Sequence, residues 1–151
     1  MEPFKVLIEL GLLDWSCIWL GFNRGWVSRE NVYDYAISLL EAGEFSENVA
    51  ILAGGRYLDE KEFESLILRE IKSDDQVESL DKWRLAHLLS IASSSDSLDE
   101  KVCKLQEVYA EFGYPEDMMS CSIYSSEHIC PLEVMNAVIK KLKQKMLPFQ
   151  S

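Results

Sequence analysis

The stretch DWSCIWLGFNRGWVSRENVYDYAISLL, residues 14–40, decides the fold of this chain. It holds three of the four tryptophans, and its apolar residues recur at helical spacing on both sides of Gly25. Gly25 suits the left-handed residue that ends a helix, and Ser28 suits the N-cap of the next helix. The pattern predicts two short helices that meet at a tight turn, with Trp15 and Trp19 in the core.

The same helix-start signal recurs along the chain. A polar cap lies between an apolar residue one position before it and another four positions after it, as around Asp14, Ser28 and Asp59. The spacing returns at Cys130, where Pro131 takes the favoured first helical position. We therefore predict an all-α fold, either an irregular antiparallel bundle or stacked helical hairpins, with about six to eight helices in a single domain, residues 1–151.

Caps and breakers give approximate helix bounds. The first helix is expected over residues 3–12 with Phe4, Leu7 and Ile8 facing inward, and Ser46 is expected to cap a short segment over residues 47–53. Residues 49–52 also have some strand character. Further helices are predicted at 60–72, from a start between residues 74 and 81 through 91, at 97–112 and at 131–146, with a loop containing one helical turn over 114–130.

Composition and charge limit the class of protein. A chain of 151 residues with 48% apolar and 27% charged residues can bury a sizeable core without metal or disulfides. The net charge of −11 disfavours nucleic acid and anionic membranes as partners, and it favours a basic protein. Simple solubility is the alternative explanation of the charge.

Targeting signals are weak at the N-terminus. MEPFKVLIELGLLDW has one lysine and no small-residue cleavage site, and no apolar run approaches the length of a membrane helix. The four cysteines form no CxxC pair, so free thiols are expected. We predict a cytoplasmic protein that needs no cofactor.

Candidate chemistry is sparse, and we predict that the protein is not an enzyme. His87 lies in an apolar helical stretch and has no neighbouring nucleophile pattern, so it is interpreted as structural. Cys121, His128 and Cys130 lack the paired spacing of structural zinc, so no metal site is predicted. Gly54 and Gly55 break a helix and do not form a phosphate loop.

Acidic residues on predicted exposed faces are the best candidates for partner binding. They are interpreted as a docking surface for a basic protein, together with a tryptophan at the turn between the first two helices of the opening stretch. The candidate set is Asp59, Glu60, Glu64, Asp74, Asp75, Glu78, Asp81 and Trp26.

The opening stretch is similar to the start of a bacterial family, domain of unknown function 2247. In that family a tryptophan-initiated helix, a glycine step, a short turn and an alanine-bearing second helix follow in this order. The matching residues here are Trp15, Gly21, Gly25, Trp26, Ser28, Tyr35 and Ala36. Small acidic helical families of this kind resemble immunity proteins of bacterial toxin–immunity loci, including contact-dependent inhibition systems.

The resemblance implies a binding protein that neutralises the C-terminal toxin domain of a secreted effector, frequently a nuclease. We expect either a monomer or a 1:1 heterodimer with the toxin domain, and no nucleic acid or membrane partner. The alternative is an acidic helical adaptor that binds another protein and has no toxin partner.

Overall fold

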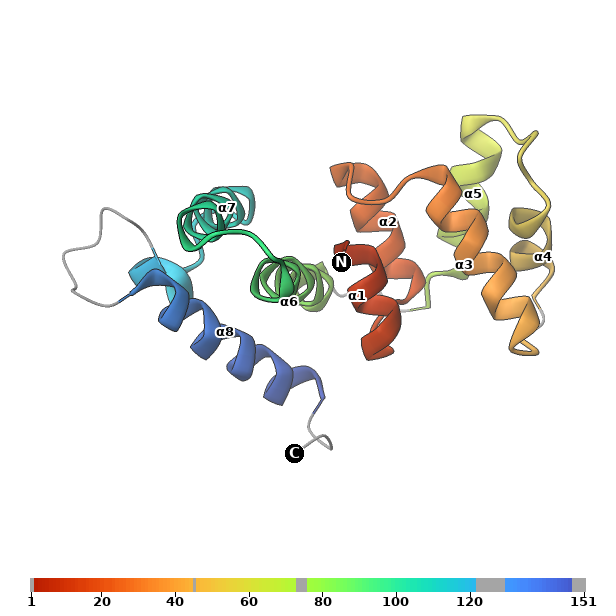
Figure 1. Ribbon diagram of the computed structural model, residues 1–151. Coiled ribbons are helices and arrows are strands. Elements are labelled where there is room, and N and C mark those ends of the chain that lie inside the picture. Colours follow the sequence, from red (N-terminus) through yellow and green to blue (C-terminus); the bar gives the residue numbers. More distant parts are fainter. Residues whose placement is uncertain (1, 45, 73–75, 122–129, 148–151) are drawn as a thin grey trace. The chain divides into compact units, whose positions relative to one another are not determined.

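The computed structural model describes residues 2–44, 46–72, 76–121 and 130–147, and these residues are helical with no strand (Figure 1). The all-α prediction is confirmed. The elements are α1 (Pro3–Leu10), α2 (Trp15–Arg24), α3 (Arg29–Glu41), α4 (Glu47–Ala53), α5 (Glu60–Glu70), α6 (Gln76–Ser93), α7 (Leu98–Glu111), the 3₁₀ segment η1 (Glu116–Cys121) and α8 (Pro131–Met146).

The predicted caps set several helix boundaries. The Asp14 carboxylate accepts a hydrogen bond from the Cys17 backbone N–H at 2.8 Å and so begins α2. Gly25 ends that helix at φ 80°, where a residue with a Cβ would be strained. Ser28 and Asn31 exchange hydrogen bonds at the start of α3, forming a capping box.

Two compact units make up the chain. Residues 1–12 and 80–151 form unit 1, and residues 13–79 form unit 2. The boundary falls near the start of α6. The single domain predicted over residues 1–151 stays a prediction.

Unit 2 packs around Phe63 of α5, whose side chain is fully buried. Its ring centroid lies 5.4 Å from that of Phe22 on α2 and 5.8 Å from that of Tyr33 on α3, and the Arg29 guanidinium lies over its face at 4.4 Å. Arg29 also donates from Nη2 to the Leu58 backbone carbonyl at 2.9 Å. These contacts join α2, α3 and the start of α5 into one core.

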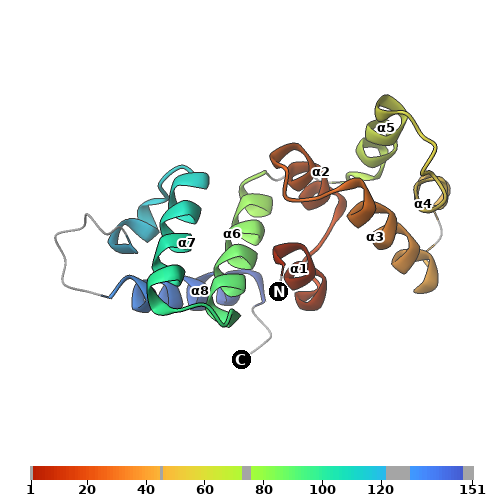
Figure 2. The same cartoon turned by 45° about the horizontal axis from the view of Figure 1, so that its top comes forward.

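Unit 1 packs around α6. Trp83 is fully buried, and the helix is buried on all sides from residue 82 to residue 86. The helices α6 and α7 are neighbours in both views, and Figure 2 shows that they run in opposite directions and that α8 crosses them (Figures 1 and 2). The inner face of α8 is formed by its buried residues Met135, Val138, Ile139 and Leu142.

Two local predictions were wrong. Ile8, predicted to face inward, is 47% exposed and Val6 is buried, whereas Phe4 and Leu7 are buried as predicted. Ser46 precedes α4 but makes no capping hydrogen bond, since its hydroxyl donates to the Glu70 carboxylate instead. The short segment expected over residues 47–53 is α4, so residues 49–52 are helical despite their strand character.

Candidate functional site

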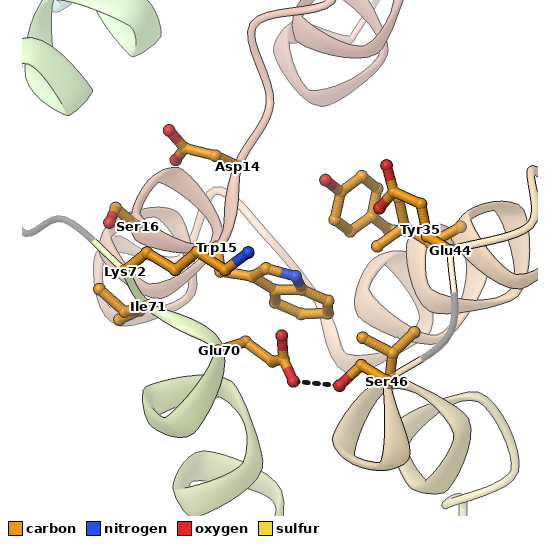
Figure 3. Close-up of a pocket in the computed structure, with 11 residues that line it drawn as sticks. Asp14, Trp15, Ser16, Tyr35, Glu44, Ser46, Glu70, Ile71 and Lys72 are labelled. Carbon is orange, nitrogen blue, oxygen red and sulfur yellow. Dashed lines mark hydrogen bonds between the residues drawn. The ribbon is translucent and has the colours of Figure 1, made fainter.

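A cavity of about 520 Å³ lies within unit 2 (Figure 3). Its walls come from the start of α2, the second half of α3, the start of α4 and the end of α5. A volume of this size lies within the usual range for small-ligand sites, roughly 300–1,000 Å³. The cavity is therefore the first candidate for a binding site in the described residues.

Two aromatic side chains form one wall. Trp15 of α2 and Tyr35 of α3 meet edge to face, with ring centroids 5.2 Å apart. Trp15 was predicted to lie in the core, but both side chains are only half-buried, and Figure 3 shows the Trp15 indole at the centre of the cavity. The Tyr35 hydroxyl donates to the Leu13 carbonyl at 3.3 Å, which fixes the ring beside Trp15.

Three carboxylates line the same cavity. Glu70 is held in place because its Oε1 accepts hydrogen bonds from the Ser46 hydroxyl and from the Asn48 amide, the latter at 3.1 Å. Asp14 sits at the N-cap of α2, and Glu44 lies exposed at the rim after α3. With Lys72 as the only cationic side chain among the described lining residues, the cavity carries excess negative charge.

The negative charge of the cavity contributes to a raised pKa of Tyr35. Burial is the largest cause that raises it, and electrostatic interactions with Glu44, Asp14 and Cys17 raise it further, to about 12. The hydroxyl therefore stays protonated and acts as a hydrogen-bond donor at neutral pH. The electrostatic field in the cavity favours positive groups and disfavours anions.

The predicted docking residues on α5 lie outside this cavity. Asp59 is exposed and caps α5, accepting a hydrogen bond from the Glu62 backbone N–H at 2.8 Å. Glu60 is exposed in the first turn, whereas Glu64 is half-buried. Glu62 is exposed in the same first turn, so the acidic cluster at the start of α5 is Asp59, Glu60 and Glu62.

Two further predicted residues have intramolecular contacts. Asp81 is half-buried in unit 1 and pairs with Arg84 at 3.3 Å and with Lys145 at 2.7 Å. Trp26, predicted to be exposed, is half-buried with the Arg24 guanidinium over its ring at 5.6 Å. Asp81 thus has a structural role that its acidic character alone did not indicate.

The remaining predicted residues lie at or before the start of α6. Glu78 is exposed in the first turn of that helix. Asp74 and Asp75 lie outside the described residues. Of the predicted set, the structure brings Asp59 and Glu60 together at the start of α5.

Among the described residues, those with metal-binding potential form no cluster. His87 is largely buried, with its ring 5.4 Å from Phe112 and 6.2 Å from Trp83, and burial lowers its pKa to about 4. His128 of the Cys121, His128 and Cys130 set lies outside the described residues. Within the described ranges, no three His, Cys, Asp or Glu residues are grouped to hold a metal ion.

Negative charge is concentrated in unit 2. Residues 13–79 contain 14 acidic and 6 basic residues, a net charge of −8, whereas residues 1–12 and 80–151 contain 12 and 9, a net charge of −3. None of the described helices is long and apolar enough to cross a membrane. The fold and the cavity define an acidic all-α protein with a site suited to positive groups.

The chain belongs to the DUF2247 family, described as uncharacterized proteins conserved in bacteria, whose profile matches residues 4–145. The match extends the similarity of the opening stretch over nearly the whole chain. No curated protein and no solved structure matches this chain.

Proposed function

We propose that this protein is a bacterial immunity protein that binds the toxin domain of a secreted effector and neutralises it. The observation that carries the proposal is the concentration of negative charge in unit 2, which has a net charge of −8 and an acidic cavity. Such a surface favours a basic partner. Membership in an uncharacterised bacterial family is compatible with this role and assigns no chemistry.

A nuclease is the toxin that this surface fits best. A nuclease cleft is basic because it must bind phosphate groups, and an acidic protein can occupy such a cleft. Charge complementarity of this kind accelerates association and selects among partners. The exposed carboxylates at the start of α5, Asp59, Glu60 and Glu62, are placed to contribute to it.

The test is co-purification with the toxin domain encoded next to this gene, followed by rescue of cells that express the toxin. A stable 1:1 complex with restored growth is the expected result. A folded protein that neither binds nor rescues would overturn the immunity role. An acidic adaptor for another basic protein would then be the function to examine.

A further inference from the structure

The cavity of unit 2 combines features that suit an organic cation. An aromatic wall, formed by Trp15 and Tyr35, offers π faces and edges in a recess of about 520 Å³. Tryptophan is the strongest aromatic partner for a cation. An acidic surface patch without such a recess would attract cations without positioning them, so the aromatic wall distinguishes this site from the exposed acids on α5.

Carboxylates at two sides of the cavity supply the counter-charge. Glu70 is oriented by Ser46 and Asn48 from α4, as Figure 3 shows for Ser46. Glu44 lies at the rim, on the side of Tyr35. Within the described part of the chain, neither Glu44 nor Glu70 forms an ion pair with a basic side chain.

We propose that this cavity binds a guanidinium group, presented by an arginine side chain of a basic protein partner. A guanidinium is planar and weakly hydrated, so it stacks on an aromatic ring while its edge donates to carboxylates. An ammonium ion is more strongly hydrated and loses more on entering the recess. The source of the arginine rests on the proposed function, whereas recognition of the guanidinium can be measured without the partner.

Lys72 competes for the same site. Its exposed side chain lines the cavity, and Figure 3 shows it extending toward Trp15. The positive charge of Lys72 offsets part of the attraction that the carboxylates exert on an incoming guanidinium. Removal of this charge should strengthen binding of the guanidinium. The proposal therefore predicts a gain of affinity when Lys72 is neutralised and a loss when Glu70 is neutralised.

The experiment titrates the whole protein with N-acetyl-arginine N-methylamide and follows the Trp15 indole N–H by two-dimensional NMR, assigned with the Trp15→Phe variant. The matched ligand is the citrulline analogue, which has nearly the same shape without the charge. The expected result is saturable perturbation of Trp15 by the arginine compound and little or none by citrulline. Equal shifts with both compounds, or no shift at Trp15, would overturn the proposal.

Variants locate the site. Glu70→Gln keeps an oxygen for Ser46 and Asn48 and should weaken binding about fivefold or more, because it removes one charge beside the guanidinium. Lys72→Gln should tighten it. Glu41→Gln, which changes an exposed carboxylate of the same unit outside the cavity, is the matched control and should change little. Equal weakening by Glu70→Gln and Glu41→Gln would indicate general charge attraction and overturn the site.

Two further measurements distinguish an arginine side chain of a protein partner from free arginine as the source of the guanidinium. Tighter binding of free arginine than of the capped residue would overturn the assignment to a protein side chain. If the toxin domain does not bind but the capped arginine does, the immunity role fails and the guanidinium site stands. If the toxin binds the Glu70→Gln variant as tightly as the native protein, the cavity is not part of that interface.

Discussion

At the scale of single residues, Gly55 lies where the structure leaves no room for a side chain. A Cβ added there would lie 2.4 Å from Leu58 Cδ1 and 2.6 Å from the Ile51 carbonyl oxygen. The Tyr33 hydroxyl also donates to the Gly55 carbonyl at 3.3 Å, so the segment cannot shift without losing that contact. Gly55→Ala should lower the free energy of unfolding by about 1–3 kcal/mol, the usual cost of overpacking.

Urea denaturation followed by far-UV circular dichroism measures this loss. Gly54→Ala is the matched control, because its added Cβ meets nothing closer than the Ala50 carbonyl oxygen at 4.0 Å. Equal midpoints for the two variants would contradict the steric explanation.

His87 makes stability depend on pH. Its folded-state pKa is about 4 against an ordinary value of 6.5, because burial disfavours the charged ring. Between these values the unfolded chain binds a proton that the folded chain does not, so stability is full above pH 6.5 and falls as the pH drops toward 4. The full loss is about 3 kcal/mol at most.

Unfolding free energies measured from pH 7 down to about 5 test this dependence, since ordinary carboxylates remain ionised there. His87→Gln should remove most of the slope in this window. A native protein whose stability stays flat, or a variant with the same slope, would assign the pH dependence to other groups. An NMR titration of the His87 ring gives its pKa directly.

Residue types in the sequence predicted local structure better than they predicted the cavity. Asp14 was interpreted only as a cap, and Trp15 only as core, and each has the predicted role in part. The cavity also requires Tyr35, Glu44 and Glu70, which lie far apart along the chain. No spacing rule links residues that meet only through the packing of four helices, so the site was not predictable from the sequence.

At the scale of elements, a buried arginine joins three segments of unit 1. Arg84 on α6 has a side chain that is only 8% exposed, and it pairs with Asp117 of η1 and with Asp81 one turn earlier. Lys141 and Lys145 of α8 bind the outer sides of the same two carboxylates, at 3.1 Å and 2.7 Å. The network therefore fixes α8 and η1 against α6.

Asp117→Asn should destabilise unit 1 by about 1–3 kcal/mol, since a buried cation loses one of its two partners. Burial opposes ionisation of Asp117, but hydrogen bonds from Arg84 and Lys141 outweigh it and lower the pKa of the carboxyl. Its contribution to stability is thus present above the ordinary value of 3.8 and is lost as the pH falls below it.

Lys141→Met is the matched variant, because the lysine binds the same carboxylate but its side chain is 63% exposed. It should cost less than about 1 kcal/mol, as exposed ion pairs do. Thermal denaturation of the two variants measures the difference. A larger loss from Lys141→Met would show that the outer pair, and not the buried arginine, holds the segments together.

Helix starts and stops were the most predictable elements. The caps at Asp14, Ser28, Asp59 and Ser97 act locally, through hydrogen bonds to backbone N–H groups three residues ahead. The beginning of α6 was ambiguous because the acidic stretch before it offers several caps. The contacts of α6 with η1 and α8 involve residues more than 30 positions apart in the sequence, and helical periodicity carries no information about such contacts.

At the scale of the whole molecule, charge is divided unequally between the two units. Unit 2 carries a net charge of −8 and unit 1 a net charge of −3, although the units are similar in helix content. Long-range attraction of a basic partner should therefore depend mainly on residues 13–79. This unequal distribution makes a docking surface and simple solubility separable by experiment.

Matched charge reversals test that distinction. Glu60→Lys with Glu62→Lys changes the first turn of α5 in unit 2, and Asp99→Lys with Glu100→Lys changes the first turn of α7 in unit 1. Each pair raises the net charge by the same amount within the first turn of a helix. The α5 pair should slow association with the toxin domain roughly tenfold at low ionic strength and weaken its dependence on salt, because electrostatic steering acts near the interface. The α7 pair should have a much smaller effect.

Stopped-flow association rates measured between about 0.01 M and 1 M ionic strength supply the comparison. Equal slowing by both pairs would mean that total charge alone attracts the partner, and unchanged rates for the α5 pair would remove that helix from the interface.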